Sequence, residues 1–291
     1  ILPVMQIPGV ITIDPYIQPT KEDERAAHIV AGNFTNNTTI SGPGYDSLTQ
    51  FGVDGTNVTV AVVDDGVGIP GDGGFYITSG NAVNAPLRGA AAGALGHGHL
   101  NATIIAGDLP FSSLLDPTGH NYGLGVARKS HIINVPLLRG TYNGSEADTC
   151  NDTVTTSGPN GVTGFISNNS WGAGLNGNSY DSLAAQYDGF VRDSSFASTI
   201  DPLVIVFSAG NQGTSGLTRP KVAKNVITTA NSENLRPELT SSANNLDDLA
   251  SSSSRGPASD GRIKPDITAP GTGVSGGRSG TDTLFGNIDA H

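Results

Sequence analysis

Cysteine is almost absent from this sequence, because Cys150 is the only one among 291 residues. No disulfide bond can therefore form within the chain. Cys150 stands in the polar stretch Asp-Thr-Cys-Asn-Asp, which predicts an inert thiol in a loop. Charged residues are also scarce, at 14% of the sequence, and 26 acidic residues outnumber 15 basic ones. The net charge of −11 argues against non-specific binding to nucleic acids and against docking on anionic membranes.

Long hydrophobic runs are missing as well. The longest apolar runs have the length of a single strand, so none is predicted to span a bilayer. The N-terminus, Ile1-Leu-Pro-Val-Met5, has no charged residue ahead of its apolar ones and does not look like a signal peptide. We therefore expect a secreted protein whose targeting segment is not part of this sequence.

The sequence is rich in glycine, with 40 residues, which predicts many tight turns. Residues 1–45 contain much Pro, Thr and Asn and predict an N-terminal extension packed on the outside of a domain. One short helix is expected within it, at Lys21–His28. Residues 46–291 predict a single large domain, incomplete at its C-terminal end.

Strand-like and helix-like segments alternate within this domain. Short, continuous, β-branched runs are typical of strands buried on both faces of a parallel sheet, and they occur at Val58–Val63, His131–Leu138, Gly164–Asn168, Leu203–Ser208 and Asn225–Thr229. Helices are expected at His99–Ala106 and Tyr180–Arg192. This alternation predicts an α/β fold, with helices on both faces of a largely parallel sheet.

Asp64 follows a run of apolar and Thr residues and precedes Asp65-Gly66. It is therefore predicted at the carboxyl end of a buried strand, where parallel α/β sheets carry their chemistry. A carboxylate there can orient a histidine ring and stabilise its protonated form. An ordinary Asp-Gly turn would give the same pattern.

His97 lies between two glycines in Gly96-His-Gly-His99, where a helix begins. Such glycines let the backbone turn sharply and present the ring, as a general base requires. A core or capping histidine is one alternative, and a metal site formed by His97 and His99 is another. Two residues so spaced point to different faces of a helix and would chelate poorly. His99 is the second candidate for the base.

The strand expected at Leu203–Ser208 runs into the turn Ser208-Ala-Gly-Asn-Gln-Gly213. Asn211 in this turn could point its side-chain amide at a developing oxyanion. Asn is also common in glycine-rich turns for its backbone preferences alone. Each of the three motifs is ambiguous by itself, whereas three strand-end motifs in this order favour one common site.

In this order the three segments resemble the acid, base and oxyanion motifs of the subtilase family, the subtilisin-like serine proteases. The resemblance implies a subtilisin-like fold, with Asp64 as the catalytic acid, His97 as the base and Asn211 as the oxyanion donor. The sequence departs from the family pattern at Asp65, where Ser or Thr is more usual, and at His99-Leu100, where the family has Thr-His.

The segment Asn168-Asn-Ser-Trp-Gly172 resembles one wall of the primary specificity pocket in these proteases. The resemblance implies that six residues on two facing walls bind substrate: Ser170, Trp171, Gly172, Ser208, Ala209 and Gly210. Further along, Ala223–Ala230 and Ser252–Gly271 are very similar to the oxidation-resistant alkaline subtilases, which carry a C-terminal β-sandwich domain.

In this family the nucleophile is a Ser in a Gly-Thr-Ser element that follows an Ala-Pro-Gly sequence. Here Ala269-Pro-Gly271 is present, but no such element follows it before His291. Gly280-Thr-Asp282 has Asp in place of Ser and is interpreted as loop. We therefore expect the serine to lie beyond residue 291 and this chain to be inactive alone. A natural pseudoenzyme is the alternative.

The resemblance thus implies a serine endopeptidase that acts on protein or peptide substrates through an Asp-His-Ser triad. No cofactor is required for this chemistry. Structural Ca²⁺ is implied by the family alone, with oxygens from loops such as Asp148–Asp152. One alternative is an inactive peptide-binding module that keeps the cleft. Another is a nucleotide-binding protein with Gly93–Gly98 as its phosphate loop, although no Lys and no complete phosphate motif are present there.

Overall fold

The structure is a computed structural model that describes residues 24–68, 82–84, 96–108, 115–121, 123–139, 142–236, 242–276 and 286–287. Gly280-Thr-Asp282 and the first half of the phosphate loop considered at Gly93–Gly98, residues 93–95, lie outside these residues. Within the described part of the chain, no helix combines the length and apolarity needed to cross a bilayer.

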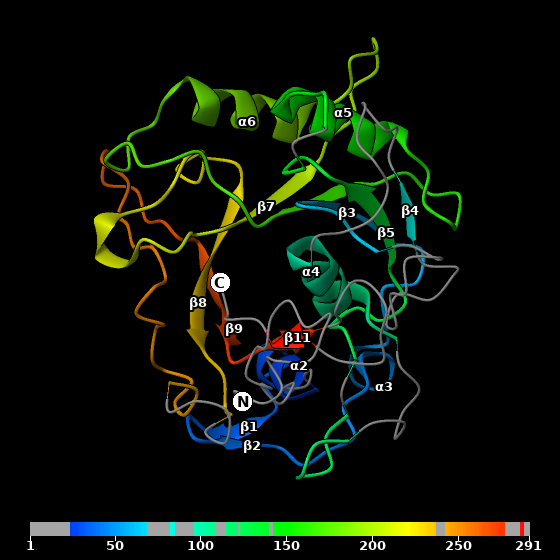
Figure 1. Ribbon diagram of the computed structural model, residues 1–291, viewed down its shortest axis with the longest axis vertical. Coiled ribbons are helices and arrows are strands. Elements are labelled where there is room, and N and C mark those ends of the chain that lie inside the picture. The colour runs from blue at the N-terminus through cyan, green and yellow to red at the C-terminus, as the bar shows by residue number, and fades with distance from the viewer. Residues whose placement is uncertain are drawn as a thin grey trace, which may run out of the picture.

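The described residues form a central sheet of seven strands (Figure 1). Their order across the sheet is β4 (Ala82–Asn84), β5 (His131–Val135), β3 (Thr59–Val63), β6 (Ile166–Asn169), β7 (Val204–Ser208), β8 (Ile227–Glu233) and β9 (Ile267–Thr272). All neighbouring strands are parallel. The predicted α/β fold is confirmed, and all five expected strands are present with shifted ends, whereas β4 and β9 were not predicted.

Helices lie on both sides of this sheet (Figure 1). One side carries α5 (Glu146–Thr155) and α6 (Ser182–Arg192), and the other carries α4 (His97–Ala106). The smaller elements are α2 (Glu24–Val30), α3 (Ser47–Phe51), the 3-10 turn η1 (Gly213–Ser215), the pair β1 (Phe34–Asn36) and β2 (Thr39–Ile40), and the pair β10 (Ser275–Gly276) and β11 (Gly286–Asn287).

Helix α5 corrects two expectations, because Asp148–Asp152 is helical and Cys150 is not in a loop. The Ser145 side chain accepts a hydrogen bond from the Asp148 backbone, and the Asp148 side chain accepts one from the Ser145 backbone. This reciprocal cap starts the helix. Cys150 is 1% exposed and belongs to the core, and burial raises the pKa of its thiol to about 12. The helix escaped prediction because its buried face consists mainly of Thr and Cys.

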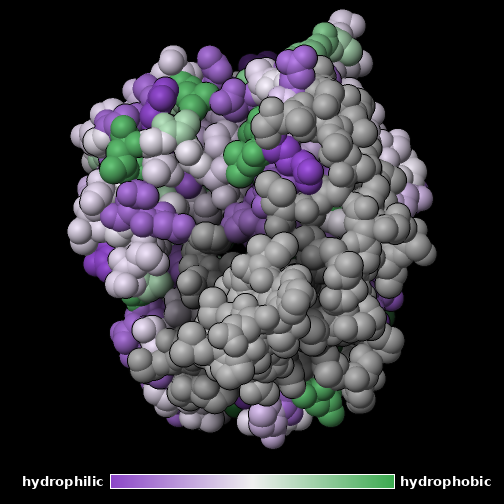
Figure 2. All heavy atoms as spheres, in the orientation of Figure 1, coloured by the Kyte–Doolittle hydropathy of each residue, from purple (hydrophilic) through white to green (hydrophobic). Residues whose placement is uncertain are grey.

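Strand β3 lies at the centre of the packing. Val60 and Val62 contact the apolar face of α4, whereas Ala61 and Val63 pack with residues of β5 in a separate cluster. Burial on both faces explains why the sequence of this strand is a continuous apolar run. On the face of the molecule drawn in Figure 2, the described hydrophobic residues form small separate groups among hydrophilic ones. Because β3 is packed on both faces, Asp64, the residue that follows it, is also buried.

The described part of the N-terminal extension is built into the domain rather than packed on its outside. Glu24, the first residue of α2, is fully buried. Its carboxylate accepts hydrogen bonds from the backbone of Gly44 at 2.5 Å, of Tyr45 at 2.6 Å and of Asn121 at 2.5 Å. Burial acts to raise the pKa of this carboxyl, but hydrogen bonds, the largest from His28, outweigh it and lower the pKa to about 2.

Replacing Glu24 by Gln is expected to lower the free energy of unfolding by about 2–4 kcal/mol, because an amide group then faces buried N–H donors. The lowered pKa of Glu24 means that the wild-type advantage is complete above the unfolded value of about 4.5 and is lost as the pH falls towards 2. Urea unfolding at pH 7 and pH 3 measures both effects. A difference between the two proteins that is the same at both pH values would contradict the expectation.

Candidate active site

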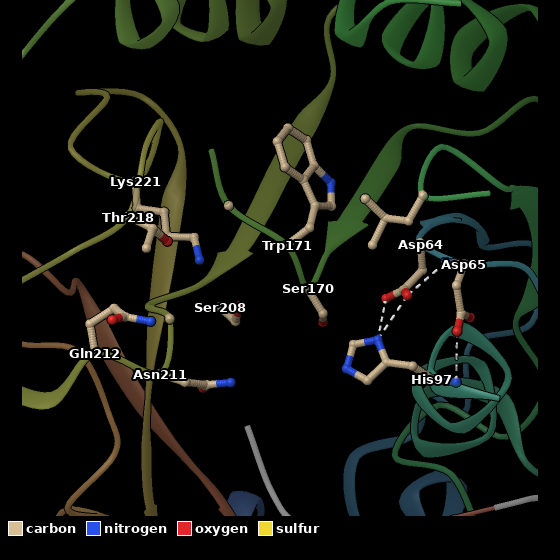
Figure 3. Close-up of a pocket in the computed structure, with 13 residues that line it drawn as sticks. Asp64, Asp65, His97, Ser170, Trp171, Ser208, Asn211, Gln212, Thr218 and Lys221 are labelled. Carbon is tan, nitrogen blue, oxygen red and sulfur yellow. Dashed lines mark hydrogen bonds and ion pairs between the residues drawn. The ribbon is translucent and has the colours of Figure 1, made fainter. Parts of the chain in front are cut away.

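Three neighbouring strands end in polar residues at one edge of the sheet. Asp64 follows β3, Ser170 follows β6, and Ser208 ends β7. Since these strands are adjacent and parallel, their carboxyl ends meet. A pocket of about 370 Å³ opens there (Figure 3). It is lined by Asp64, Asp65, His97, Leu138, Ser170, Trp171, Gly172, Ser208, Gly210, Asn211, Gln212, Thr218 and Lys221.

The Asp64 carboxylate and the His97 ring are in direct contact. Nδ1 of His97 lies 2.8 Å from Oδ1 and 2.9 Å from Oδ2 of Asp64, which is fully buried. Asp64 also accepts hydrogen bonds from the Asp65 backbone at 2.7 Å and from the Asn101 amide at 2.9 Å. Asn101 was not predicted at the site, although it stands one helical turn after His97 on α4. These donors hold the carboxylate so that it faces the ring.

The start of α4 presents the His97 ring. Gly96 has φ +136°, a conformation that side chains disfavour. A methyl group on Gly98 would lie 2.6 Å from the Gly66 carbonyl oxygen and 2.8 Å from Cβ of Asp64, so only glycine lets the helix approach β3 this closely. Asp65 accepts hydrogen bonds from the first backbone N–H groups of the helix, at 3.3 Å from His97 and 2.7 Å from Gly98. Asp65 thus caps α4 and ties it to the end of β3.

The neighbouring carboxylates stabilise the charged form of the His97 ring relative to that of an isolated histidine. Burial acts to lower the pKa of the ring, but the hydrogen bond to Asp64 and the charges of Asp64 and Asp65 raise it above its ordinary value. The side chain of His97 remains 23% exposed. With Nδ1 on Asp64, the second ring nitrogen, Nε2, faces across the pocket (Figure 3). This is the arrangement of a base that takes a proton from a group in the pocket.

His99, the second candidate for the base, is elsewhere. It is fully buried, its Nδ1 accepts a hydrogen bond from the Gly68 backbone at 3.1 Å, and it does not line the pocket. His97 and His99 therefore point to different surroundings, as expected for their spacing. Among the residues that the structure describes, no three His, Cys, Asp or Glu side chains gather in a way that could hold a metal ion.

The turn after β7 forms the side of the pocket opposite His97. Ser208, Gly210 and Asn211 line it, and the Asn211 amide extends towards the His97 side (Figure 3). Gly210 has φ +106° in this turn. Ala209, which follows β7, does not line the pocket, because its side chain lies in the core and is 2% exposed. Of the predicted wall Ser208–Gly210, only two residues therefore face the pocket.

Ser170, Trp171 and Gly172 line the other side of the pocket. Trp171 donates a hydrogen bond from Nε1 to Asn169 at 3.1 Å, and its ring lies edge-on to Phe207 and near Tyr187. Much of the indole is thus held by the core, and only part of it lines the pocket. The polar residues of the pocket, rather than the indole ring, therefore determine its chemistry.

Five pocket residues were not among the predicted site residues: Asp65, Leu138, Gln212, Thr218 and Lys221. Thr218 and Lys221 belong to the long connection between β7 and β8. The sequence of this connection has no strand-like or helix-like pattern from which a site could be predicted. A Gly-Thr-Ser sequence also occurs in this connection, at Gly213–Ser215, where it forms η1. Ser215 is exposed and is not among the residues that line the pocket. It is therefore not placed to be a nucleophile for His97.

Comparison with known proteins agrees with this architecture. The chain has 17% sequence identity to a cold-adapted subtilisin-like serine proteinase, with a TM-score of 0.58 over 93% of this chain and 80% of that one. It has 18% identity to sphericase, with a TM-score of 0.53 over 94% of this chain and 80% of that one. The fold is therefore subtilisin-like. The model of the Subtilase family matches residues 55–288, and the chain belongs to the subtilase family, a family of serine proteases.

Proposed function

We propose that this protein is a serine endopeptidase of the subtilisin type, with Asp64 and His97 as two members of an Asp-His-Ser triad. The contact between Nδ1 of His97 and the buried Asp64 carboxylate carries this proposal, because it leaves Nε2 directed into a pocket that Asn211 enters from the other side. Asp64 orients the imidazole and stabilises the imidazolium that forms.

The proposed reaction is acyl transfer to a serine. His97 takes the proton of the serine hydroxyl as the hydroxyl attacks a peptide carbonyl, and later gives this proton to the leaving amine. The Asn211 amide donates a hydrogen bond to the oxyanion. An extended substrate would pair with the strand-end segments that border the pocket. We propose that the serine belongs to a Gly-Thr-Ser element beyond residue 291, and that the protein is secreted and belongs to the oxidation-resistant branch. Structural Ca²⁺, which only the family implies, stays a prediction, and the described residues contain no group of three His, Cys, Asp or Glu side chains that could hold it.

A fluorophosphonate probe tests the nucleophile. The full-length protein is expected to be labelled on one serine outside residues 1–291, and the 291-residue chain is expected to remain unlabelled. Peptide mapping by mass spectrometry identifies the labelled residue. Labelling of Ser170 or Ser208, which line the pocket, would contradict the assignment. A full-length protein that binds peptides but is neither labelled nor active would be an inactive peptide-binding module instead.

Replacing Asn211 by Leu is expected to lower kcat by roughly 10²–10³-fold and to leave KM nearly unchanged, because the oxyanion forms only after substrate has bound. The matched control is Gln212→Leu, which changes the next residue on the same pocket. The kcat of the control is expected to fall by less than about tenfold. A residue that does not donate to the oxyanion contributes little to stabilising its charge in the transition state. Steady-state kinetics on one peptide compares the two. Equal losses, or a rise in KM alone, would remove Asn211 from the proposed role.

A further inference from the structure

An amino group lines the same pocket on the side away from His97. Lys221 is 1% exposed, and it lines the pocket together with Thr218 from the connection between β7 and β8. Figure 3 shows its amino end directed into the pocket, between the segment that carries Trp171 and the turn that carries Ser208. A buried cation at this place requires an explanation, because lysine is almost never fully buried unless it is paired.

Two glycines locate this amino group. A methyl group on Gly172 would collide with the Thr218 hydroxyl and would lie 3.1 Å from Nζ of Lys221. A methyl group on Gly210 would lie 3.0 Å from the same hydroxyl and 3.3 Å from the same Nζ. Both polar groups therefore lie against both walls of the pocket, and the lack of side chains on the two glycines lets them approach the walls this closely.

Neither polar group has a partner within the described residues. The Thr218 hydroxyl is buried without a hydrogen-bond partner, and the hydrogen bonds and ion pairs of the described residues include none made by the amino group of Lys221. Burial lowers the pKa of Lys221 to about 7. The other ionisable groups that line the pocket are Asp64, Asp65 and His97, which lie together on the opposite side in Figure 3. An ammonium group in this setting favours an anionic ligand, which would restore its lost solvation.

The position of the pocket defines which part of a substrate enters it. On the proposed function, the scissile carbonyl lies between the His97 ring and the Asn211 amide, which border the pocket. The side chain on the acyl side of that carbonyl belongs to the same residue and is within reach of the Gly172 and Gly210 walls. We propose that Lys221 makes this an acid-selective pocket, which takes the glutamate or aspartate side chain that precedes the scissile bond. This inference rests on the proposed peptidase function.

Lys221 and Thr218 both supply hydrogen-bond donors to such a carboxylate. Hydrogen bonds between charged groups discriminate more strongly than apolar contacts, because a neutral side chain would leave the buried ammonium without a counter-ion. The net charge of −11 repels acidic substrates at long range, so the selectivity depends on the local cation. The lysine is a specificity residue in this view and takes no part in bond cleavage.

The first experiment compares peptides that are identical except for Glu, Asp, Gln, Leu or Lys before the scissile bond, with the full-length protein. We expect kcat/KM for Glu or Asp to exceed that for Gln by about 10–100-fold. Lys221→Met should bring the ratio of Glu to Gln close to one while cleavage of the Leu peptide continues. The matched control is Lys224→Met, which removes an exposed lysine of the same connection that lies over the Tyr180 ring and not in the pocket. It should keep the acid preference.

A binding experiment separates this inference from the peptidase function. Product-like peptides that end in Glu, Gln or Leu are titrated into the protein and into Lys221→Met by calorimetry, with thermal unfolding to verify that the variant is folded. Tighter binding of the Glu peptide that disappears in the variant supports the acid-selective pocket even if no peptide is cleaved. Equal binding of Glu and Gln peptides, cleavage without acid preference, or a preference that survives in Lys221→Met would overturn it. Cleavage of all peptides alike would overturn the inference and leave the proposed function standing.

Discussion

Replacing His97 by Ala is expected to lower kcat by roughly 10⁶-fold with little change in KM. The ring is the general base that faces the pocket, and without it no group accepts the proton of the attacking hydroxyl. Residual activity would come from the Asn211 amide and from substrate binding. The full-length protein is required, with kcat measured on one peptide and folding checked by circular dichroism.

The control for this experiment is His99→Asn, which tests the second histidine. Asn can still accept the hydrogen bond that His99 receives from the Gly68 backbone, so the fold is expected to survive. Because His99 is buried away from the pocket, kcat should fall by less than about tenfold. A large loss of kcat in folded His99→Asn together with an active His97→Ala protein would exchange the two roles.

Replacing Asp64 by Asn is expected to lower kcat/KM by roughly 10⁴-fold. An amide N–H can donate to Nδ1 and so stabilise the tautomer that carries its proton on Nε2, which then cannot accept the proton of the attacking hydroxyl. Asn101, which donates to Asp64 at 2.9 Å, would compete for the remaining oxygen. The expected loss is therefore one of chemistry, with the pocket largely intact.

The same variant has a pH signature. His97 must be neutral to act as a base, so activity rises with pH through its pKa. In the wild type, the hydrogen bond to Asp64 and the charges of Asp64 and Asp65 raise this pKa above its ordinary value. Asp64→Asn removes two of these contributions, and the acid limb of the kcat/KM profile should move to lower pH. Asp65→Asn keeps the hydrogen bond and should move it less. An acid limb that stays in place in Asp64→Asn would contradict the role given to this carboxylate.

The resemblance and the strand pattern together located the edge of the sheet at which the pocket opens. Apolar runs ahead of Asp64, Ser170 and Asn211 predicted three strand ends, and parallel strands bring such ends to one edge. The glycines beside His97 indicated the sharp start of α4, which the Gly98 contacts explain. Helix α5 was missed because its buried face is made of Thr and Cys, so the helical periodicity of large apolar residues is absent.

What the sequence determined by itself was the class of fold and the order of the acid, base and amide motifs, since both follow from local patterns of burial and turn formation. What the tertiary structure decided was which side chains share one pocket. Asn101 reaches Asp64 from α4, Ala209 turns into the core, and Lys221 and Thr218 arrive from a connection without periodicity. Contacts of this kind depend on how elements far apart in the chain pack against one another, and no local pattern records them.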